Sequence, residues 1–340
     1  MSDAKYGLDI GTCNVRLSYV NTGEILTEKN AITIKDRKII LGYGDDAYEM
    51  FEKAPENVEV VFPVVEGVIS DIDKMQLILE FLYKKLNYGK MVRGSDFLIA
   101  VPTDTTEVEK RAFHELVANS KIKPRSISVV EKSVADAVYC GVDIASPRGN
   151  IIVNIGADTT DISVVSLGGI VLCNTIKVAG NSINENIINT VKQSEGKLIG
   201  FKSAEQLKFN LVDLGMRPAH NEMKLFGRVL SSGLPVRTTI SSELINPVVM
   251  ETIEPIIDGV KRTLEKTPPE LAADIVENGM YLLGGSANMK NIDSLFSRET
   301  GLKVNLMPDP INSTIKGATK IMSSSKYDSV RYFPQEKVYN

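Results

Sequence analysis

The stretch LDIGTCNVRL, residues 8–17, runs from apolar residues into an acid, turns at a glycine and resumes an apolar alternation. This pattern predicts two antiparallel strands joined by a short turn. Asp9 stands where the first strand ends, and burying its carboxylate is costly unless a cation or a hydrogen-bond donor meets it. Consecutive backbone N–H groups at such a turn form a concave positive surface for anionic oxygens. The stretch therefore predicts a turn that holds a ligand.

The same pattern occurs a second time at VNIGADTTDISVVSL, residues 153–167. Each copy has an apolar strand, an acid or its amide, Ile-Gly, a bend of small residues and a second strand. The match between the regions of Gly11 and Gly156 indicates a duplicated unit, with one hairpin in each domain. Two such turns facing one another would hold a phosphate chain from both sides. The alternative is two unrelated tight hairpins.

Composition limits the function classes. The chain has 340 residues, of which 43% are hydrophobic, so it can bury a large core divided between two domains. A formal net charge of -4 gives no general attraction for nucleic acids. Two histidines distant in sequence argue against a histidine metal site and a Ser-His-Asp triad.

The sequence also limits where in the cell the protein can be located. The three cysteines are scattered and form no CxxC pair, and the N-terminal MSDAKYG lacks the apolar core of a signal peptide. No apolar run reaches the roughly 20 residues that cross a bilayer. We expect a cytoplasmic protein whose membrane contact, if any, is peripheral.

Short alternating segments and longer helical patterns together predict an α/β protein. Helical spacing occurs over 75–86 and over 108–119, where Thr105 or Thr106 can cap the second helix. Strands are expected at 6–10, 15–20, 97–101, 151–155, 162–166 and 170–175.

Other glycine-rich segments carry weaker signals. In MYLLGGSANM, an apolar strand leads into Gly284 and Gly285, where small residues let a flat ring or a phosphate approach the backbone. No G-x-x-x-x-G-K-[ST] motif is present in the sequence, which excludes a P-loop. GYGDDA, residues 42–47, runs into acidic residues and is interpreted as a loop.

Together these pieces resemble the actin, sugar-kinase and heat-shock-70 ATPase superfamily, and within it the MreB family of bacterial actins. The resemblance covers nearly the whole chain. Besides the two hairpins it rests on PVVEGVISDID (63–73), VPTDTTEVEKRAF (101–113), SLGGIVLCNTIKVAGNSINENIINTV (166–191), SAEQLKFNL (203–211) and LLGGSANMKNIDSLFSRETGLKV (282–304).

The resemblance implies an actin-like (ribonuclease H-like) α/β fold of two domains with a nucleotide cleft between them. Each domain would contain a mixed five-stranded sheet and a smaller subdomain. Domain I would comprise residues 1–146 and 312–340, and domain II residues 147–311. The small subdomains would lie at about 31–72 and about 181–245.

The resemblance also implies the residues that bind ATP or ADP and Mg²⁺. Asp9 would hold Mg²⁺ through water, Asn154 would belong to the same metal site, and Thr159 would take part in catalysis. The nucleotide contacts would come from Gly11, Thr12, Cys13, Asn14, Gly156, Ala157, Asp158, Thr159, Thr160, Gly180, Ala204, Glu205, Gln206, Leu207, Lys208, Gly284, Gly285, Ser286 and Ala287. For Glu205 and Lys208, one turn apart, the alternative is a solvated surface pair.

The chain departs from the family at VVEKSVADAV, residues 129–138. There the family has two glutamates, the second of which orients water for attack on the γ-phosphate. Lys132 occupies that second position. A lysine ammonium has three donors and no acceptor, so it cannot polarise a water molecule, and we expect crippled hydrolysis. The alternative is that Glu131 substitutes for the missing acid.

Two further departures lie near the phosphates. Asn154 stands where the family has Asp, which weakens the metal site, and Asp158 stands where it has Gly. The added negative charge of Asp158 would repel nucleotide unless it is neutralised. We expect a compensating Lys132–Asp158 pair, with Lys132 able alternatively to reach the γ-phosphate.

The loss of this glutamate resembles the divergent MreB paralogues of wall-less helical bacteria such as Spiroplasma, the third paralogue in particular. The resemblance implies an ATP-binding cytoskeletal filament for cell shape or motility. Protomers would stack head to tail, in single or paired protofilaments, and other MreB paralogues are candidate partners. The alternatives are a structural pseudoATPase filament with little nucleotide dependence and a small-molecule kinase of the same fold.

Two surface segments complete the predictions. KKLNYGKMVRGS, residues 84–95, mixes basic residues with apolar ones in a way that suits an anionic membrane surface. The proposed membrane contacts are Leu86, Tyr88, Met91 and Val92. The alternative is a solvated basic loop whose apolar residues pack inward. The polar tail from Ser323 is expected to be flexible.

Overall fold

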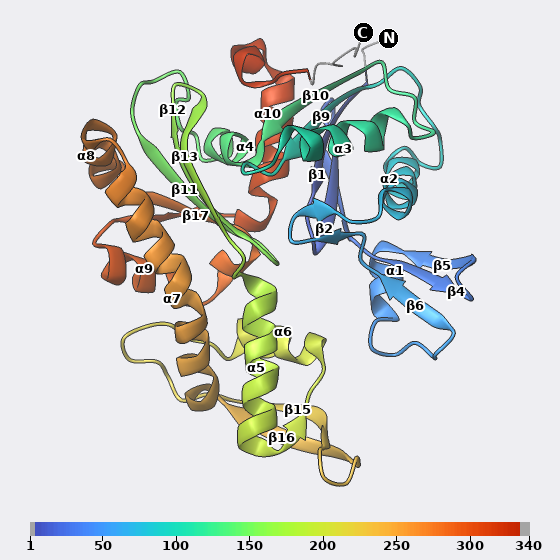
Figure 1. The fold of residues 1–340 in the computed structure, drawn as a ribbon, viewed down its shortest axis with the longest axis vertical. Helices are drawn as coiled ribbons and strands as arrows, with labels where there is room; N and C mark the ends of the chain where they lie inside the picture. The colour runs from blue at the N-terminus through green and yellow to red at the C-terminus, as the bar shows by residue number, and fades with distance from the viewer. Residues whose placement is uncertain (1–3, 334–340) are drawn as a thin grey trace. The chain divides into compact units, whose positions relative to one another are not determined.

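The computed structural model describes residues 4–333, which divide into two compact units (Figure 1). One unit comprises residues 4–147, 165–171 and 312–333, and the other comprises residues 148–164 and 172–311. The segment 165–171, assigned to domain II from the sequence, belongs with the first unit. Its turn is held there because the Leu167 N–H donates to the Ser146 carbonyl at 3.1 Å.

The first unit is built on a mixed sheet with the strand order β10-β9-β1-β2-β3. Its strands are β1 (Lys5–Ile10), β2 (Asn14–Tyr19), β3 (Glu24–Lys29), β9 (Asp96–Val101) and β10 (Ser126–Glu131). β1 pairs antiparallel with β2 and parallel with β9, so that Leu8 lies opposite Leu17 on one side and Ile99 on the other. The predicted hairpin at residues 8–17 is therefore present.

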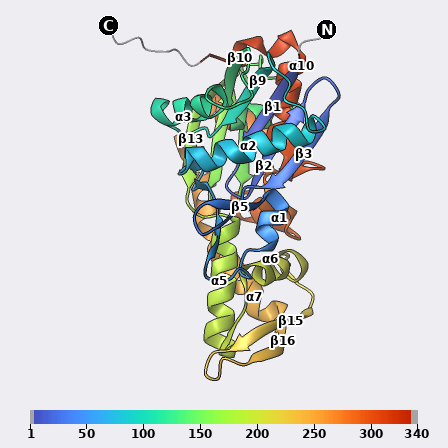
Figure 2. The same ribbon diagram turned by 90° about the vertical axis from the view of Figure 1, so that its right-hand side faces the viewer.

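Four helices cover this sheet, namely α2 (Ile72–Leu86), α3 (Glu107–Ala118), α4 (Lys132–Tyr139) and α10 (Ser313–Ser323). Figure 2 shows α2 in front of β1 and β2, with α10 behind them. α3 starts with a capping box between Thr106 and Glu109, so that of the two caps the sequence left open, Thr105 and Thr106, it is Thr106 that caps the helix. α10 packs against α4 so closely that a Cβ on Gly317 would lie 1.8 Å from the Ala135 carbonyl oxygen.

Smaller elements complete this unit. β4 (Ile32–Lys35), β5 (Ile39–Tyr43) and β6 (Val58–Val61) form a three-stranded sheet, and β7 (Val64–Val65) pairs with β8 (Val68–Ile69). The loop predicted at 42–47 is wrong, because α1 spans Gly44–Glu49. Gly44 starts this helix with φ +60°, and the carboxylate of Glu28 accepts from the next backbone N–H at 2.9 Å.

The second unit repeats the plan of the first. Its sheet has the order β13-β12-β11-β17-β18, formed by β11 (Asn150–Ile155), β12 (Thr160–Ser166), β13 (Gly169–Ile176), β17 (Met280–Leu283) and β18 (Val304–Leu306). The adjoining ends of β12 and β13 fall in the segment 165–171, which groups with the first unit. β11 and β17 are parallel, and so are β17 and β18. In both sheets the first strand in the sequence is the central one. The next two strands follow on one side of it through two hairpins, and two later parallel strands lie on its other side. The duplication inferred from the sequence is confirmed.

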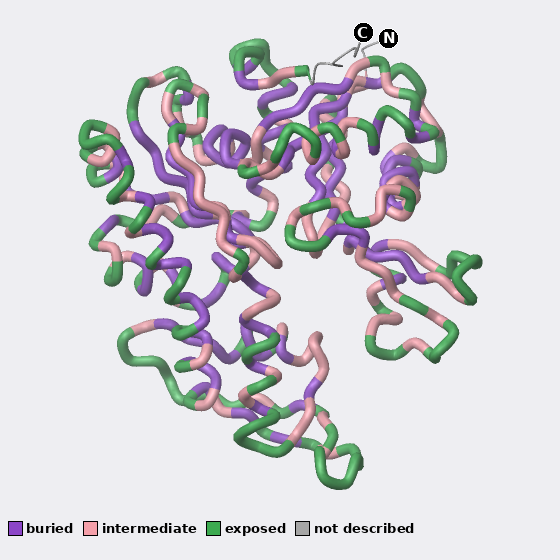
Figure 3. The backbone as a smooth tube through the Cα atoms, in the orientation of Figure 1, coloured by how far each residue is buried: buried purple, intermediate pink, exposed green. Residues whose placement is uncertain are grey.

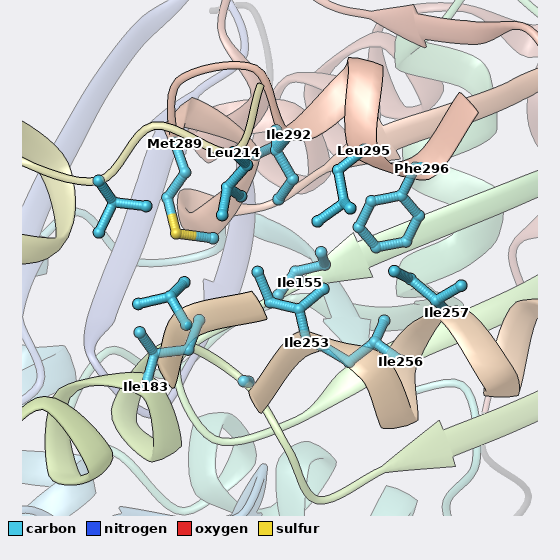
Figure 4. Close-up of a cluster of buried hydrophobic side chains, with 14 of the residues drawn as sticks. Ile155, Ile183, Leu214, Ile253, Ile256, Ile257, Met289, Ile292, Leu295 and Phe296 are labelled. Atoms are coloured by element: carbon cyan, nitrogen blue, oxygen red, sulfur yellow. The ribbon is translucent and has the colours of Figure 1, made fainter. Parts of the chain in front are cut away.

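The remaining elements of the second unit are α5 (Gly180–Glu195), α6 (Phe201–Asn210), α7 (Ser242–Lys266), α8 (Pro269–Asn278) and α9 (Ile292–Thr300), with a small sheet of β14 (Lys197–Leu198), β15 (Glu222–Val229) and β16 (Pro235–Ser241). Figure 4 shows part of its core, where Ile253, Ile256 and Ile257 of α7 lie near Leu295 and Phe296 of α9. Short 3₁₀ helices span Gly285–Asn288 and Pro310–Asn312.

Burial follows the two sheets (Figure 3). The central strands β1 and β11 are buried along most of their length, which fixes the turns at their ends. The chain after Ser323 is structured as far as the structure describes it. A 3₁₀ helix spans Ser325–Val330 and Tyr332 pairs with Val129, so the expected flexibility is wrong up to residue 333, and residues 334–340 lie outside the described part.

Candidate functional site

The two hairpin turns have the same local geometry. In the first unit, the Gly11 N–H donates to the Asn14 carbonyl at 2.9 Å, and in the second the Gly156 N–H donates to the Thr159 carbonyl at 3.0 Å. A Cβ on either glycine would lie about as close to the same oxygen, 3.0 Å for Gly11 and 2.9 Å for Gly156. In both turns the glycine N–H therefore bonds the carbonyl three residues further along the chain, and the tight bend leaves little room for a Cβ.

The turn of the first unit is braced from β3. The Asn30 side chain donates to the Gly11 carbonyl at 2.9 Å, and its backbone N–H donates to the Cys13 carbonyl at 2.9 Å. The Lys29 ammonium lies 3.2 Å from the Cys13 sulfur. These contacts hold the shape of the turn and place a positive charge beside it.

Asp9 lies at the base of this turn between two cations. Its carboxylate is 4% exposed; one oxygen lies 3.0 Å from the Arg16 guanidinium and the other 3.0 Å from the Lys132 ammonium. Lys132 also donates to the Ile10 carbonyl at 2.8 Å. The costly buried acid is thus neutralised within its own unit.

The electrostatics of Asp9 follow from these contacts. Burial acts to raise the pKa of its carboxyl group, but the charges and hydrogen bonds of Lys132 and Arg16 outweigh burial and lower the pKa below its ordinary value. Asp9 is therefore ionised at neutral pH.

Lys132 is placed by its position as the first residue of α4, directly after β10. The contact with Asp9 was not foreseen from the sequence, which paired Lys132 with Asp158. Arg16 could have been foreseen, because it lies directly opposite Asp9 in the β1–β2 register, where cross-strand side chains meet. The contact between Lys132 and Asp9 could not, since it joins residues 123 positions apart in the sequence.

Glu131, the alternative acid, points to different partners. Its carboxylate accepts from the Tyr332 hydroxyl at 3.1 Å and lies 3.6 Å from the Lys110 ammonium. Burial and the charge of Glu131 raise the pKa of Tyr332 to about 12, so this phenol stays a neutral donor. Neighbouring residues that leave a strand point to opposite sides, and here Glu131 and Lys132 indeed contact different groups.

The turn of the second unit packs against the start of α5. The Gly180 N–H donates to the Gly156 carbonyl at 3.1 Å, and the Asn181 N–H donates to the Ala157 carbonyl at 2.7 Å. The Asn181 side-chain amide donates to the Asp158 carboxylate at 2.6 Å. Asp158, which the sequence predicts to depart from the family, is therefore hydrogen-bonded within its own unit.

Several residues predicted to contact the nucleotide lie close to Gly180. A Cβ on it would lie 3.1 Å from the Gly156 carbonyl, 3.1 Å from the Ser286 hydroxyl and 3.3 Å from the Lys208 ammonium. Lys208 is buried and donates to the Gly180 carbonyl at 3.0 Å. The alternative of a solvated Glu205–Lys208 pair is thus wrong for Lys208.

Gly284, in the glycine-rich segment after β17, lies next to the end of β11. Its φ of +85° suits glycine, and a Cβ there would lie 2.3 Å from the Ile155 carbonyl and 2.6 Å from the Asn154 side-chain oxygen. In the second unit, the turn after β11, the start of α5, α6 and the segment after β17 therefore converge.

The other predicted site residues differ in how far they are exposed to solvent. Gln206 is exposed, whereas Thr12, Glu205 and Gly285 are half-buried. Buried in the second unit are Thr160, Ala204, Leu207 and Ala287. The hydroxyl of Thr160 donates to the Val178 carbonyl at 2.7 Å, so it supports the turn.

The Mg²⁺ predicted at Asp9 does not fit the residues found there. Magnesium is bound through carboxylate oxygens and water, and each Asp9 oxygen already lies 3.0 Å from a cationic nitrogen. Within residues 4–333, no group of three or more His, Cys, Asp or Glu side chains could hold a metal ion.

Three of the apolar residues of the basic loop at 84–95 pack inward. Leu86 is 6% exposed, and Met91 and Val92 pack against the core of the first unit. Tyr88 differs, since it is 85% exposed and has φ +51°. None of the described helices is long and apolar enough to span a membrane.

Two repeated sheets of this order, each with a hairpin turn on its central strand and a small subdomain, define an actin-like fold. The sequence model of the MreB/Mbl protein family matches residues 3–329. The chain therefore belongs to the MreB/Mbl family.

Characterised relatives agree along almost the full length. The cell shape-determining protein Mbl of Bacillus subtilis is 31% identical over 333 residues, covering 98% of this chain and 98% of that protein. The cell shape-determining protein MreB of Escherichia coli K12 is 32% identical over 321 residues, covering 93% of this chain and 92% of that protein.

Solved structures agree with the fold. MreB5 of Spiroplasma citri bound to AMPPNP has a TM-score of 0.91 and 31% identity, covering 97% of this chain and 98% of that one. The MamK double helical filament, at 20% identity, has a TM-score of 0.77 and covers 95% of this chain and 99% of that one, a likeness of fold.

Proposed function

We propose that this protein is an ATP-binding bacterial actin that polymerises into cytoplasmic filaments for cell shape or motility, with strongly reduced ATP hydrolysis. Nucleotide binding is supported by the paired turns at Gly11 and Gly156, whose bends repeat at the ends of both central strands. The Spiroplasma citri relative solved with AMPPNP and with ADP shares the fold over 97% and 96% of this chain. The proposed role in cell shape is supported by the Mbl and MreB relatives, which are cell shape-determining proteins.

Reduced hydrolysis is carried by one observation, the contacts of Lys132. Its ammonium is held 3.0 Å from Asp9 and 2.8 Å from the Ile10 carbonyl, beside the turn that is proposed to bind phosphates. A cation held there favours bound phosphate but accepts no proton from water. Because general-base catalysis contributes about 10²–10⁴ in rate, we expect hydrolysis slower by about that factor.

The contacts of Glu131 support this reading against the alternative acid. With its carboxylate engaged by Tyr332 and Lys110, Glu131 would have to leave both partners to orient a water molecule beside Lys132. The divergence at this position is the reason for placing the chain with the Spiroplasma-type paralogues, the third in particular. Such paralogues are then the expected partners in mixed filaments, next to head-to-tail contacts of the chain with itself.

Sedimentation tests filament formation and its nucleotide dependence. The protein is pelleted with ATP, with ADP and without nucleotide, and binding is measured in parallel by calorimetry. We expect binding of ATP and a larger pellet with ATP. Equal pellets in all three conditions, without nucleotide binding, would instead establish the structural pseudoATPase, and absence of any pellet would contradict the filament. Phosphorylation of a small substrate would establish the kinase alternative.

Membrane contact is proposed only through Tyr88. This side chain is exposed at the loop 84–95, which also carries Lys90 and Arg93, a combination that suits an anionic lipid surface. We expect Tyr88→Asp to lower flotation with vesicles that contain an acidic phospholipid, while leaving filament pelleting unchanged. Met91→Asp is not a usable test, because Met91 packs against the core. Unchanged flotation of the Tyr88 variant, or no flotation of the wild type, would remove the proposal.

A further inference from the structure

The base of the first hairpin turn carries one net positive charge. Arg16 and Lys132 contribute two cations and Asp9 one anion, all within hydrogen-bonding distance. The interaction between them is strong because the groups are largely removed from water, with 5% of the Asp9 side chain and 16% of the Lys132 side chain exposed. This charge is built into the fold of one unit and needs no bound ion.

The two cations are not equivalent. Arg16 is 7% exposed and is fixed at both ends of its guanidinium, by Asp9 and by the Asn312 side-chain oxygen at 3.0 Å. Lys132 uses two donors, for Asp9 and for the Ile10 carbonyl, whereas an ammonium has three. Lys132 is also the more exposed of the two, and the carbonyl that it contacts belongs to the residue directly before Gly11. Of these two, Lys132 is thus the cation that a ligand in the turn would meet.

A divalent cation has no comparable place at this turn. Magnesium demands near-octahedral oxygen coordination, usually with one or two carboxylates. Each oxygen of the single carboxylate, Asp9, already lies 3.0 Å from a cationic nitrogen, and a dication brought beside it would be repelled by Lys132 and Arg16. The ammonium of Lys132 provides part of the charge that a metal ion would otherwise bring to a polyphosphate.

We infer that Lys132 takes the place of the divalent cation in nucleotide binding, so that this protein binds a nucleoside triphosphate without Mg²⁺. The inference rests on the proposed ATP binding and deepens it. Lysine is suited to the role as a compact point charge for phosphate. Binding is then carried by the Asp9-anchored ammonium and by the backbone of the turn.

Calorimetric titration of the full chain with AMPPNP tests this without any contribution from hydrolysis. One titration contains Mg²⁺ and the other contains EDTA. We expect dissociation constants within about threefold of each other, less than the loss of one charged contact would cause. A wild-type protein that binds AMPPNP with Mg²⁺ but about 30-fold or more weakly with EDTA would overturn the inference and leave the proposed ATP binding intact. No binding in either buffer would overturn both.

Variants assign the effect to Lys132. In Lys132→Met we expect binding in EDTA to weaken about tenfold, the order of one charge-assisted hydrogen bond, and added Mg²⁺ to recover part of the loss because Asp9 regains a free oxygen. The double variant Asp9→Asn with Lys132→Met removes both charges and guards against an unfolded single variant. It should bind weakly in EDTA too, and EDTA binding as tight as that of the wild type in either folded variant would overturn the inference.

Lys121→Met is the matched control. Lys121 also pairs with a buried carboxylate, that of Glu80 at 3.2 Å, but this pair lies between α2 and the segment after α3. Its removal should leave AMPPNP binding in both buffers unchanged. An equal loss in this variant and in Lys132→Met would mean that the effect is a general one of charge or stability, which contradicts the inference.

Discussion

At the residue scale, the buried carboxylate of Asp9 determines how its neighbours are used. It is compensated by Arg16, which lies opposite on β2, and by Lys132, which arrives from the start of α4. A lysine in this setting is a structural cation as well as the proposed phosphate ligand, so its replacement should change stability and binding together. Experiments on Lys132 therefore need a stability readout beside every functional one.

Stability should depend on the ionised state of Asp9. The pKa of Asp9 is lowered on folding, so the stabilisation is present above its ordinary pKa of about 4 and is lost as pH falls through the lowered folded value. We expect the free energy of unfolding to decrease with falling pH below about 4, measured by urea denaturation. Asp9→Asn should remove this part of the pH dependence.

The same variant should be unstable at neutral pH. Asp9→Asn leaves two largely buried cations without their anion, at a cost of about 3 kcal/mol in the free energy of unfolding. Adding Lys132→Met should recover part of that loss, because it removes one of the unpaired charges. A single variant as stable as the wild type would show that the triad is not a stabilising unit.

At the element scale, the turns depend on close packing between elements distant in the chain. α4, which carries Lys132, is held against α10 at Gly317, where a Cβ would lie 1.8 Å from the Ala135 carbonyl. Replacing a helical glycine with alanine usually adds up to about 1 kcal/mol of stability.

Gly317→Ala should have the opposite effect. The added methyl group must push α10 and α4 apart, and we expect a loss of about 3 kcal/mol, seen as a lower denaturation midpoint. Ser323→Ala, at the exposed end of the same helix, should change stability by less than about 0.5 kcal/mol. Similar midpoints for the two variants would contradict the packing described for α4.

Local pattern predicted the hairpins, the helices α2 and α3 and a cap at Thr105 or Thr106, because each depends on residues close in sequence. It failed for α1, where Gly44 and the acidic residues after it resemble a loop but start a helix that Glu28 supports from β3. It also missed the contacts of Lys132 with Asp9 and of Lys208 with Gly180. These are tertiary contacts between segments far apart in the sequence, and the number of residues between two segments does not reveal whether they meet in the fold.

At the scale of the whole molecule, the two units share one duplicated fold, but the charged groups beside their hairpin turns differ. The turn of the first unit has two cations beside Asp9, whereas that of the second unit carries an acid, Asp158, which accepts a hydrogen bond from Asn181. In a filament whose subunits hydrolyse ATP slowly, nucleotide state changes little after assembly. We therefore expect persistent polymers whose turnover is governed by nucleotide occupancy or by partner subunits.

The most direct test of this account is the rate of phosphate release during assembly with ATP, compared between the wild type and Lys132→Glu. We predict slow release by the wild type and a rate at least about tenfold higher in Lys132→Glu, which would place an acid at the position proposed to orient water. A thermal melt of both proteins ensures that folded samples are compared. Equal and brisk release by the two proteins would contradict the account.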